Sequence, residues 1–422
     1  MRTLYNSLLT PLRLPVALLA AWRSRDVHGQ LEWRQRQGRD LPRGTADGVW
    51  LHGASVGEAR LVQALAEQLR ERRADLPLSG SAMTLAGRSQ LPSAVELDRT
   101  FFAPLDFTPY VRRTLDAVDP KLLTLVETEL WPNLIHESHG RGCRLSMVNA
   151  RLSEERMRRY ERFRRLYAPC LSRMHAIGAQ SDRDAERFCE LGARPDRVRV
   201  TGNVKYDLAA PADTRAAWQE RLSIADTDLV WVAGSTAEGE EELLLPVYAA
   251  LRGEHRDLRW IVAPRHPERA GSVTRAIRRA GWTAFELSAL TSDVVPPEFD
   301  VLVVDQVGKL AELYRLADVA FVGGSLAPIG GHNLLEPATV GVPVAFGPHV
   351  GHVEEMAQAL LRASGGHQVT DAQGLTRVLG GWLRHPEERM AIARRGQGVV
   401  EGNRGALRVT TDLLLELLDG RA

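Results

Sequence analysis

Residues 318–337 have the sequence DVAFVGGSLAPIGGHNLLEP, in which an apolar run is followed by two glycine pairs and an apolar segment that ends at a proline. This pattern predicts a strand over residues 319–322, a glycine-rich turn, and a helix that begins near Asn333. Repeated strand–turn–helix units form parallel sheets covered by helices. The segment therefore indicates an α/β fold.

The same alternation continues along the rest of the chain. Helices are predicted at residues 58–70 and 153–167, among others, and further strands at residues 48–56, 122–126, 144–148, 198–201, 229–233, 258–263, 301–304 and 342–346. The two series are separated by a predicted linker at residues 209–215, around Pro211. We therefore expect two Rossmann-like domains that face a cleft, with residues 41–208 in the N-terminal domain and residues 209–422 in the C-terminal domain.

Composition agrees with two globular domains and excludes several classes of protein. The 422 residues are too many for one ordinary core, and 44% of them are hydrophobic and 25% charged. The net charge of +1 argues against a nucleic-acid-binding protein. The three cysteines are widely spaced, and neither they nor any Asp/His cluster has the spacing of metal ligands, so no metal is expected.

The N-terminus contains an apolar stretch from Leu4 to Trp22 that is interrupted by Pro11, Arg13 and Pro15. A spanning helix needs about 20 apolar residues, and no cleavage site of a signal peptide follows. Because the flanking residues are basic, this segment is interpreted either as an interfacial anchor on an anionic membrane or as a buried N-terminal helix.

The glycine-rich segment of residues 323–336 is the strongest candidate for a ligand site. Glycines let backbone amides approach an anion, and the N-terminus of the following helix adds positive charge. We expect the segment to bind the phosphate and ribose of a nucleotide, with Glu336 on the ribose and with Gly324, Ser325 and His332 as further contacts. The alternative is a capping box formed by Asn333 and Glu336.

Other predicted strand ends in the second half carry phosphate-binding residue types. Arg265 follows Pro264 directly after a strand, where a guanidinium can bind a phosphate with two hydrogen bonds. A helix is predicted to begin at Val307, Gly308 and Lys309, and Ser235 and Thr236 end another strand. Ser235 and Glu238 have the spacing of a capping box, which is sufficient to explain that pair.

The first half places acidic residues at strand ends. Glu58 lies at a predicted helix start, where the helix dipole favours its ionised form, as a general base requires; an ordinary first-turn glutamate is the alternative. Glu127 and Glu129 follow a strand, where paired acids can assist proton transfer or simply occupy a solvated turn. Lys205 either points into the cleft or is a surface lysine.

Taken together, these motifs resemble the 3-deoxy-D-manno-octulosonic acid (Kdo) transferase family over nearly the whole chain. The matching segments, in the family's order, are SVGE at 55–58, ETELWPN at 127–133, NARLS at 149–153, GNVK at 202–205, PRHPER at 264–269, GGHN at 330–333 and GPH at 347–349. The resemblance implies an inverting GT-B glycosyltransferase that moves Kdo from CMP-Kdo to the lipid A precursor (lipid IVA) in lipopolysaccharide assembly. It also implies no cofactor, a position on the cytoplasmic side of the inner membrane, and residues 1–40 as a membrane-associated segment.

Site residues follow from the same motif match. Glu58 would be the base, and Glu129 and Lys205 would stabilise the transition state. Ser55, Gly57 and Glu127 are candidate acceptor contacts. CMP would be held by Pro264, Arg265, Val307, Gly308, Lys309, Asn333, Leu334, Leu335 and Glu336.

Three positions depart from the family's usual pattern: Ala237, Lys309 and His352 stand where the family often has histidine, an acidic residue and asparagine, respectively. Two alternative functions remain open. One is a GT-B transferase that uses another nucleotide sugar. The other is a catalytically silent protein that binds a nucleotide sugar or lipid, which the presence of Glu58, Glu129 and Lys205 argues against.

Overall fold

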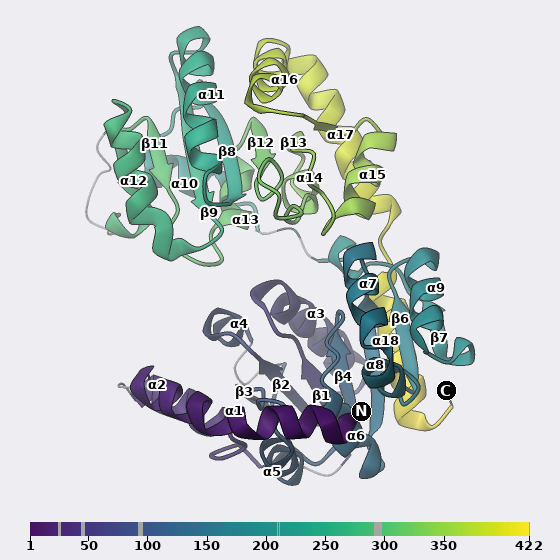
Figure 1. Cartoon of the computed structure of the whole chain (residues 1–422). Helices are drawn as coiled ribbons and strands as arrows, with labels where there is room; N and C mark the ends of the chain where they lie inside the picture. The colour runs from purple at the N-terminus through teal and green to yellow at the C-terminus, as the bar shows by residue number, and fades with distance from the viewer. Residues whose placement is uncertain are drawn as a thin grey trace. The chain divides into compact units, whose positions relative to one another are not determined.

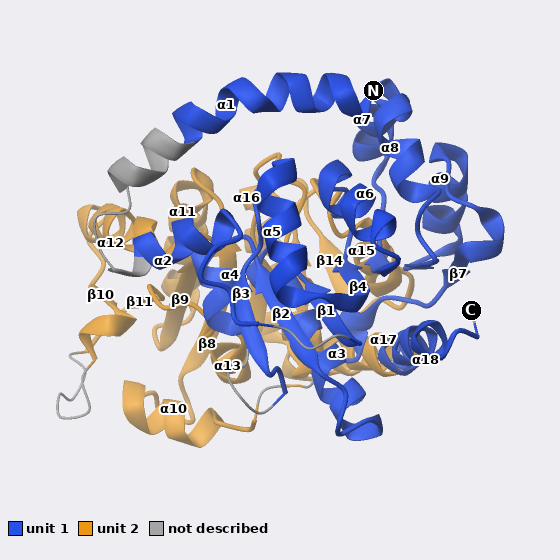
Figure 2. Ribbon diagram, turned by 90° about the horizontal axis from the view of Figure 1, so that it is seen from below, with its two compact units in different colours: residues 1–208, 403–422 blue, residues 209–402 orange. Residues whose placement is uncertain are grey.

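The computed structural model describes residues 1–23, 27–43, 47–91, 96–208, 210, 212–290 and 298–421. The chain forms two compact units, residues 1–208 with 403–422 and residues 209–402 (Figure 2). Pro211 of the predicted linker lies outside the described residues. The prediction that one domain runs from residue 209 to 422 is wrong for residues 403–422, because the last helix packs into the first unit.

The first unit contains a seven-stranded sheet in the order β3-β2-β1-β4-β5-β6-β7, with every neighbouring pair parallel. The strands are β1 (Gly48–His52), β2 (Leu78–Ala82), β3 (Arg99–Phe102), β4 (Pro120–Val126), β5 (Arg144–Ala150), β6 (Ala176–Ala179) and β7 (Val198–Val200). Its helices are α1 (Arg2–Arg23), α2 (Val27–Arg36), α3 (Val56–Arg72), α4 (Leu85–Gln90), α5 (Thr108–Val118), α6 (Pro132–Gly140), α7 (Glu154–Arg162), α8 (Arg164–Leu171), α9 (Asp182–Leu191) and α18 (Ala406–Asp419), with short 3-10 turns η1 (Pro195–Arg197) and η2 (Val204–Tyr206) (Figure 1).

Both faces of this sheet are buried, as is usual for parallel sheets. Val49 and Leu51 of β1 point to a core that includes α3 and α18, whereas Trp50 between them points to the opposite core. Four leucines of α18 belong to the first of these cores: Leu413, Leu414, Leu417 and Leu418. These side chains explain why the C-terminal helix returns to the first unit.

The second unit has the same architecture, with a parallel sheet in the order β10-β11-β9-β8-β12-β13-β14. Its strands are β8 (Leu229–Thr236), β9 (Leu258–Pro264), β10 (Ala284–Glu286), β11 (Val301–Val303), β12 (Val319–Val322), β13 (Val344–Phe346) and β14 (Gly366–Gln368). Its helices are α10 (Arg215–Leu222), α11 (Glu240–Glu254), α12 (Ala270–Arg279), α13 (Leu310–Leu313), α14 (Leu335–Thr339), α15 (Glu354–Arg362), α16 (Ala372–Arg384) and α17 (Pro386–Gly402), with 3-10 turns η3 (Pro267–Arg269), η4 (Leu287–Ala289) and η5 (Tyr314–Leu316).

Two differences from the sequence prediction have a clear physical origin. The single helix predicted over residues 153–167 is two helices, α7 and α8, because the chain leaves helical geometry at Phe163 (φ −112°, ψ 28°). Strands β2, β3, β6, β10 and β14 were not predicted. Sequences such as LSGSA and GHQ contain too few large apolar residues to indicate a strand.

The N-terminal segment forms one helix, α1, although it contains Pro11 and Pro15. Leu4, Leu8 and Leu12 recur at every fourth residue, and each side chain is more than half exposed. The described side chains of α1, up to residue 16, therefore argue against a buried helix over that part of the segment, and the side chains of residues 17–22 lie outside the described ones. Among the described residues, no helix has both the length and the apolar character needed to cross a membrane.

Candidate functional site

In the first unit, four predicted site residues come together at the edge of the sheet where the parallel strands end. Glu58 lies in the first turn of α3, and its Oε2 accepts a hydrogen bond from the backbone N–H of the N-cap residue Ser55 at 2.8 Å. Glu127 and Glu129 follow β4, and Lys205 lies in η2 after β7. Glu127, Glu129 and Lys205 are all close enough to Glu58 to change its pKa.

The electrostatic environment of Glu58 differs from the prediction. The side chain is 9% exposed, and burial, followed by repulsion from Glu127 and Glu129, raises its pKa to about 8. The Ser55 amide and Lys205 act in the opposite direction but do not compensate. The expectation that the helix dipole keeps this carboxylate ionised is therefore wrong, because desolvation and two like charges outweigh the dipole. A carboxyl group with such a pKa is a stronger base once it is ionised.

Glu127 is held in an unusual backbone conformation and in a close ion pair. Its φ of +61° lies in the left-handed region, which residues other than glycine seldom adopt. Its Oε1 lies 2.6 Å from Nζ of Lys205. Burial alone would raise the pKa of Glu127, but Lys205, and then Arg151 and Arg156, bring it below its usual value. Glu127 is thus stabilised in its ionised form, and Lys205 is not a free surface lysine.

Glu129 accepts a hydrogen bond from Nε1 of Trp131 at 2.8 Å, and burial raises its pKa.

The turn that carries Lys205 is held by hydrogen bonds to two asparagines. Asn149, at the end of β5, accepts a hydrogen bond from the Val204 N–H at 2.9 Å, and Asn203 accepts one from the Lys205 N–H at 3.0 Å. Asn149 also has a positive φ, of +51°. The bond from Asn149 therefore ties the end of β5 to the turn after β7 that carries Lys205.

Two neighbouring glycines explain how Glu58 fits into this edge. A Cβ atom on Gly53 would lie 2.9 Å from the backbone carbonyl and Cβ of Glu58, so only glycine allows the strand to pass so close to α3. Beside Gly57, by contrast, there is open space, because a Cβ atom there would meet only Oγ of Ser55, at 4.0 Å. Gly57 is exposed, and its role as an acceptor contact stays a prediction.

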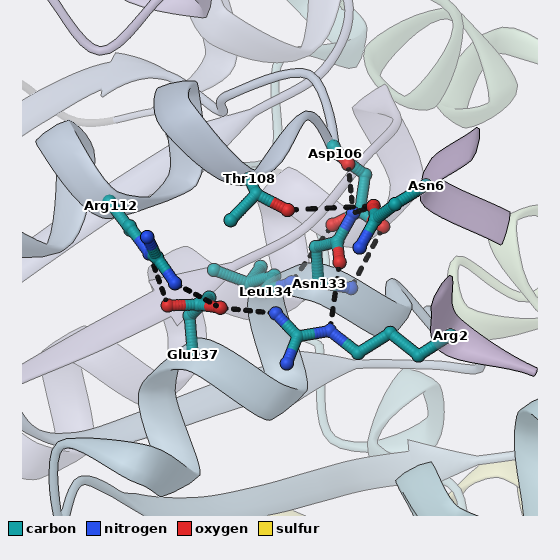
Figure 3. Close-up of polar contacts among 8 residues, drawn as sticks. All are labelled: Arg2, Asn6, Asp106, Thr108, Arg112, Asn133, Leu134 and Glu137. Carbon is teal, nitrogen blue, oxygen red and sulfur yellow. Dashed lines mark hydrogen bonds and ion pairs between the residues drawn. The ribbon is translucent and has the colours of Figure 1, made fainter. Parts of the chain in front are cut away.

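The helix that follows the Glu127–Trp131 turn is anchored to α1 (Figure 3). Asp106 accepts hydrogen bonds from the first amides of α6, those of Asn133 (3.0 Å) and Leu134 (2.8 Å), and from the hydroxyl of Tyr5 (2.9 Å). Burial raises the pKa of Asp106 to about 6. Arg2 donates to Oδ1 of Asn133 at 3.1 Å and pairs with Glu137. One polar cluster thus connects the N-terminal helix to the segment that carries Glu129.

In the second unit, the glycine-rich loop already has an anionic ligand, which is Glu240. This residue begins α11 and is fully buried. Its two carboxylate oxygens accept hydrogen bonds of 2.7–3.0 Å from the backbone amides of Ala237, Gly324, Ser325, Leu326 and Ala327. The prediction that these amides bind a substrate phosphate is therefore wrong for residues 324–327. They bind a carboxylate of the protein instead.

The turn after this loop does not form the alternative capping box. The N-cap residue of α14 is Leu334, and Oδ1 of Asn333 accepts a hydrogen bond from the Leu335 N–H at 3.2 Å. Glu336 is half-buried, and its charge acts together with burial to raise the pKa of Tyr314. Leu334 and Leu335 are buried, so their side chains belong to the core.

Ser235 and Thr236 have structural environments that the sequence did not indicate. Ser235 has a φ of +55° and does not cap a helix, because the N-cap residue of α11 is Gly239. The capping box predicted for Ser235 and Glu238 is therefore absent. Thr236 donates its hydroxyl hydrogen to Glu241 at 2.7 Å, and Glu241 forms two hydrogen bonds with Arg269. Oγ of Ser325 is likewise engaged, by the Val322 carbonyl and the Gly347 amide.

The positively charged part of this unit is centred on Arg265, which is exposed at the end of β9, directly after the buried Pro264. Burial lowers the pKa of His332 to about 4, and Arg265, His352 and His266 act in the same direction, which places these residues near one another. His332 and His352 pack against glycines, since Cβ atoms on Gly324 and Gly330 would lie 2.7–2.8 Å from their rings. Arg265 and the histidine N–H groups form a site that suits an anion.

The turn of residues 307–309 lies after β11, as predicted. Val307 is exposed, Gly308 has a φ of +89°, and Lys309 is the N-cap residue of α13. Nζ of Lys309 pairs with Glu312 at 3.1 Å. The lysine that departs from the family's usual acidic residue thus has an acidic partner in the next turn.

Sequence reasoning missed Glu240, Asn149 and Asp106. Glu240 was not predicted as a site residue, and four of its five amide partners, at residues 324–327, lie more than 80 positions later in the chain. A glycine pair followed by amides without an obvious acceptor is compatible with an internal carboxylate as well as with a substrate phosphate. The sequence does not distinguish the two.

We predict that Glu240→Ala will loosen the loop of residues 324–327, because five buried amides would lose their acceptor at a cost of at least about 3 kcal/mol. Hydrogen exchange measured by mass spectrometry should show faster exchange of these amides. Glu242→Ala, at an exposed position of the same helix, is the control and should change stability by less than about 0.5 kcal/mol. Unchanged protection in Glu240→Ala would contradict the assignment.

Comparison with known proteins identifies the family. The family model described as 3-Deoxy-D-manno-octulosonic-acid transferase (kdotransferase) matches residues 31–208. A 3-deoxy-D-manno-octulosonic acid transferase from Haemophilus influenzae is 33% identical over 382 residues, which cover 88% of this chain and 87% of that protein. The Bordetella pertussis protein of the same name is 30% identical and covers 96% of each chain.

Solved structures support the fold. UDP-GlcNAc 2-epimerase from Neisseria meningitidis aligns with a TM-score of 0.62 and 15% identity over 87% of this chain and 100% of that chain. Anabaena HepE in complex with UDP and glucose aligns with a TM-score of 0.59 and 15% identity over 89% of this chain and 100% of that chain. At this identity the likeness concerns the fold alone, which is GT-B-like with two parallel sheets.

The family model and the two relatives confirm the resemblance inferred from the sequence motifs. The chain belongs to the 3-deoxy-D-manno-octulosonic acid (Kdo) transferase family of glycosyltransferases.

Proposed function

We propose that this chain transfers Kdo from CMP-Kdo to lipid IVA with inversion at the anomeric carbon, and that Glu58 is the general base. The observation that carries the proposal is the cluster of Glu58, Glu127, Glu129 and Lys205 at one sheet edge. Membership of the Kdo transferase family supports the choice of sugar and acceptor.

The reaction is a single displacement. The acceptor hydroxyl oxygen attacks the anomeric carbon of Kdo while the bond to the CMP phosphate oxygen breaks, and the hydroxyl proton passes to Glu58. CMP leaves with the electron pair of the broken bond. One base is sufficient for this chemistry, and a carboxyl group with a pKa of about 8 accepts a proton more readily than an ordinary glutamate.

Charge is the second requirement of the reaction. Negative charge develops on the departing CMP phosphate, and we assign Arg265 and the neighbouring His332 to that group. Pro264, Val307 to Lys309 and Asn333 to Glu336 complete the proposed CMP site. We assign Lys205 and Glu129 to stabilising the transition state, in which the anionic Kdo loses its bond to phosphate.

We predict that Glu58→Gln abolishes transfer while CMP binding persists. The amide oxygen can still accept the Ser55 hydrogen bond, so the α3 N-terminus stays intact, but the side chain can no longer take a proton. Mass spectrometry of the product from CMP-Kdo and lipid IVA measures transfer, and calorimetry measures CMP binding. Glu71→Gln, exposed at the far end of the same helix, should retain parental turnover.

Retained turnover in Glu58→Gln would exclude Glu58 as the base. The same assay tests the two alternative functions. Turnover of UDP- or ADP-sugars but not of CMP-Kdo would identify another GT-B transferase. Tight donor binding without any product would identify a silent binding protein.

We predict that kcat/KM rises with pH and levels off above about pH 8. The base acts only when it is ionised, and because its pKa is raised to about 8, the ionised fraction increases tenfold per pH unit below that value. Glu129→Gln removes one negative charge that raises this pKa, so the rise should move to lower pH. A flat profile from pH 6 to 9, or a shift to higher pH in Glu129→Gln, would contradict the assignment.

We also propose that the protein lies at the cytoplasmic side of the inner membrane and that α1 contacts the bilayer. The exposed leucines of α1 support this proposal. Leu8→Ser with Leu12→Ser should move the protein from the membrane pellet to the supernatant on ultracentrifugation of lysed cells. Leu85→Ser changes an equally exposed leucine of α4 and should leave the distribution unchanged. Equal effects of the two variants would refute a specific role of α1.

A further inference from the structure

The first unit contains a pocket that does not include any member of the carboxylate cluster. Its volume is about 460 Å³. It lies where α1 passes the start of α5 and the segment after α2, and it is lined by Thr10, Arg13, Leu14, Gln37, Arg39, Tyr110 and Arg113. Three of these seven residues are arginines, so the pocket is strongly cationic.

The three arginines have no carboxylate partner within the described part of the chain, where the nearby Asp40 pairs with Arg34 instead. The guanidinium groups of Arg13 and Arg113 lie over the ring of Tyr110, at 5.1 and 5.2 Å from its centroid. Nε of Arg13 also donates to the Tyr110 hydroxyl at 3.3 Å. Cation–π contacts offset only part of the repulsion among three neighbouring cations. An anion among the three guanidinium groups would relieve the remaining repulsion.

The position of Arg39 is determined by the close packing of the preceding residue, Gly38, on α5. Gly38 has a φ of +70°, and a Cβ atom on it would lie 2.5 Å from the Tyr110 carbonyl oxygen and 2.9 Å from Cβ of Arg113. Only glycine allows the chain to pack so closely on α5, and the next residue is therefore held beside Arg113. Arg39 and Arg113 are close enough for their charges to interact. Burial lowers the pKa of Arg113, and the positive charge of Arg39 lowers it further.

One side of the pocket is apolar. Leu14 lines it and is 68% exposed. Cations beside an exposed leucine match a molecule with an anionic head and an apolar tail. Planar guanidinium groups match the oxygen atoms of a phosphate better than lysines would.

We propose that this pocket binds the phosphate of an anionic phospholipid headgroup, with Arg13, Arg39 and Arg113 as its ligands and Leu14 against the start of the acyl chains. This proposal rests on the proposed contact of α1 with the bilayer. It goes further, because it assigns a specific headgroup site instead of general attraction to a charged surface. The site is separate from the proposed reaction centre.

The test measures binding of the full chain to phosphatidylcholine vesicles with and without about one third phosphatidylglycerol by cosedimentation. We expect binding to require phosphatidylglycerol and to weaken by more than about tenfold in Arg39→Gln, because a charge-assisted phosphate contact is lost. Arg34→Gln removes the same charge from the same segment outside the pocket. It should weaken binding by no more than about fivefold, the effect of one charge near an anionic surface.

Arg34 and Arg39 are both exposed, so neither variant should impair folding. Equal losses in the two variants would overturn the proposal in favour of general surface charge. Inorganic phosphate and a short-chain phosphatidylglycerol are compared as competitors of vesicle binding. If both compete equally well, the pocket binds phosphate in general, and the proposal of a lipid headgroup site is overturned. A raised KM for lipid IVA in detergent, with unchanged vesicle binding, would reassign the pocket to a phosphate of the acceptor.

Transfer in detergent by Arg39→Gln separates this proposal from the proposed function. Turnover close to that of the parent, together with weaker vesicle binding, is the result expected. Absence of transfer in the parent chain itself would instead refute the proposed function and leave the vesicle result interpretable.

Discussion

Every neighbouring strand pair in both sheets is parallel, and this constraint determines where chemistry can take place. Parallel strands end at one edge, so turns that are far apart in the sequence meet there. In the first unit, the turns after β1, β4 and β7 bring three carboxylates and one lysine together. Several carboxylates buried close together are unfavourable when all are ionised, because they repel one another and have lost contact with water. Two features reduce this cost: Glu127 pairs with Lys205, and the pKa of Glu58 is raised, which favours its neutral form.

In the second unit, a carboxylate of the protein occupies the glycine-rich turn at the end of β12. Glu240 accepts hydrogen bonds from the backbone amides that the sequence pattern assigns to a ligand. This internal carboxylate fixes the loop before any donor arrives, so a donor does not have to order it. In the proposed mechanism, donor recognition therefore depends on the residues around this loop, Arg265 and His332 above all. A prearranged site loses less conformational entropy on binding than a loop that orders around its ligand.

Much of the fold and of the candidate site could be predicted from the sequence, for identifiable reasons. The strands with continuous apolar runs, such as β4, β8 and β12, follow directly from their composition. Short or small-residue strands do not, because they form through pairing and packing with segments distant in the sequence, and not through their own composition. Glu58, Glu129 and Lys205 could be chosen from motifs, but the pKa of Glu58 could not. It depends on burial and on charges 69 and 71 positions away in the sequence, at Glu127 and Glu129. The role of Glu240 was missed because it likewise depends on contacts with residues far away in the sequence, at positions 324–327.

The return of α18 to the first unit has a consequence for how the protein is made. The second unit is an insertion in the first, because residues 209–402 separate the body of the first unit from its last helix. During synthesis from the N-terminus, the core that includes Val49 and Leu51 lacks Leu413, Leu414 and Leu417 until the whole second unit has been synthesised. The unit whose synthesis begins first is therefore completed after the second unit, and a premature stop between residues 402 and 413 would damage the N-terminal core and spare the C-terminal sheet.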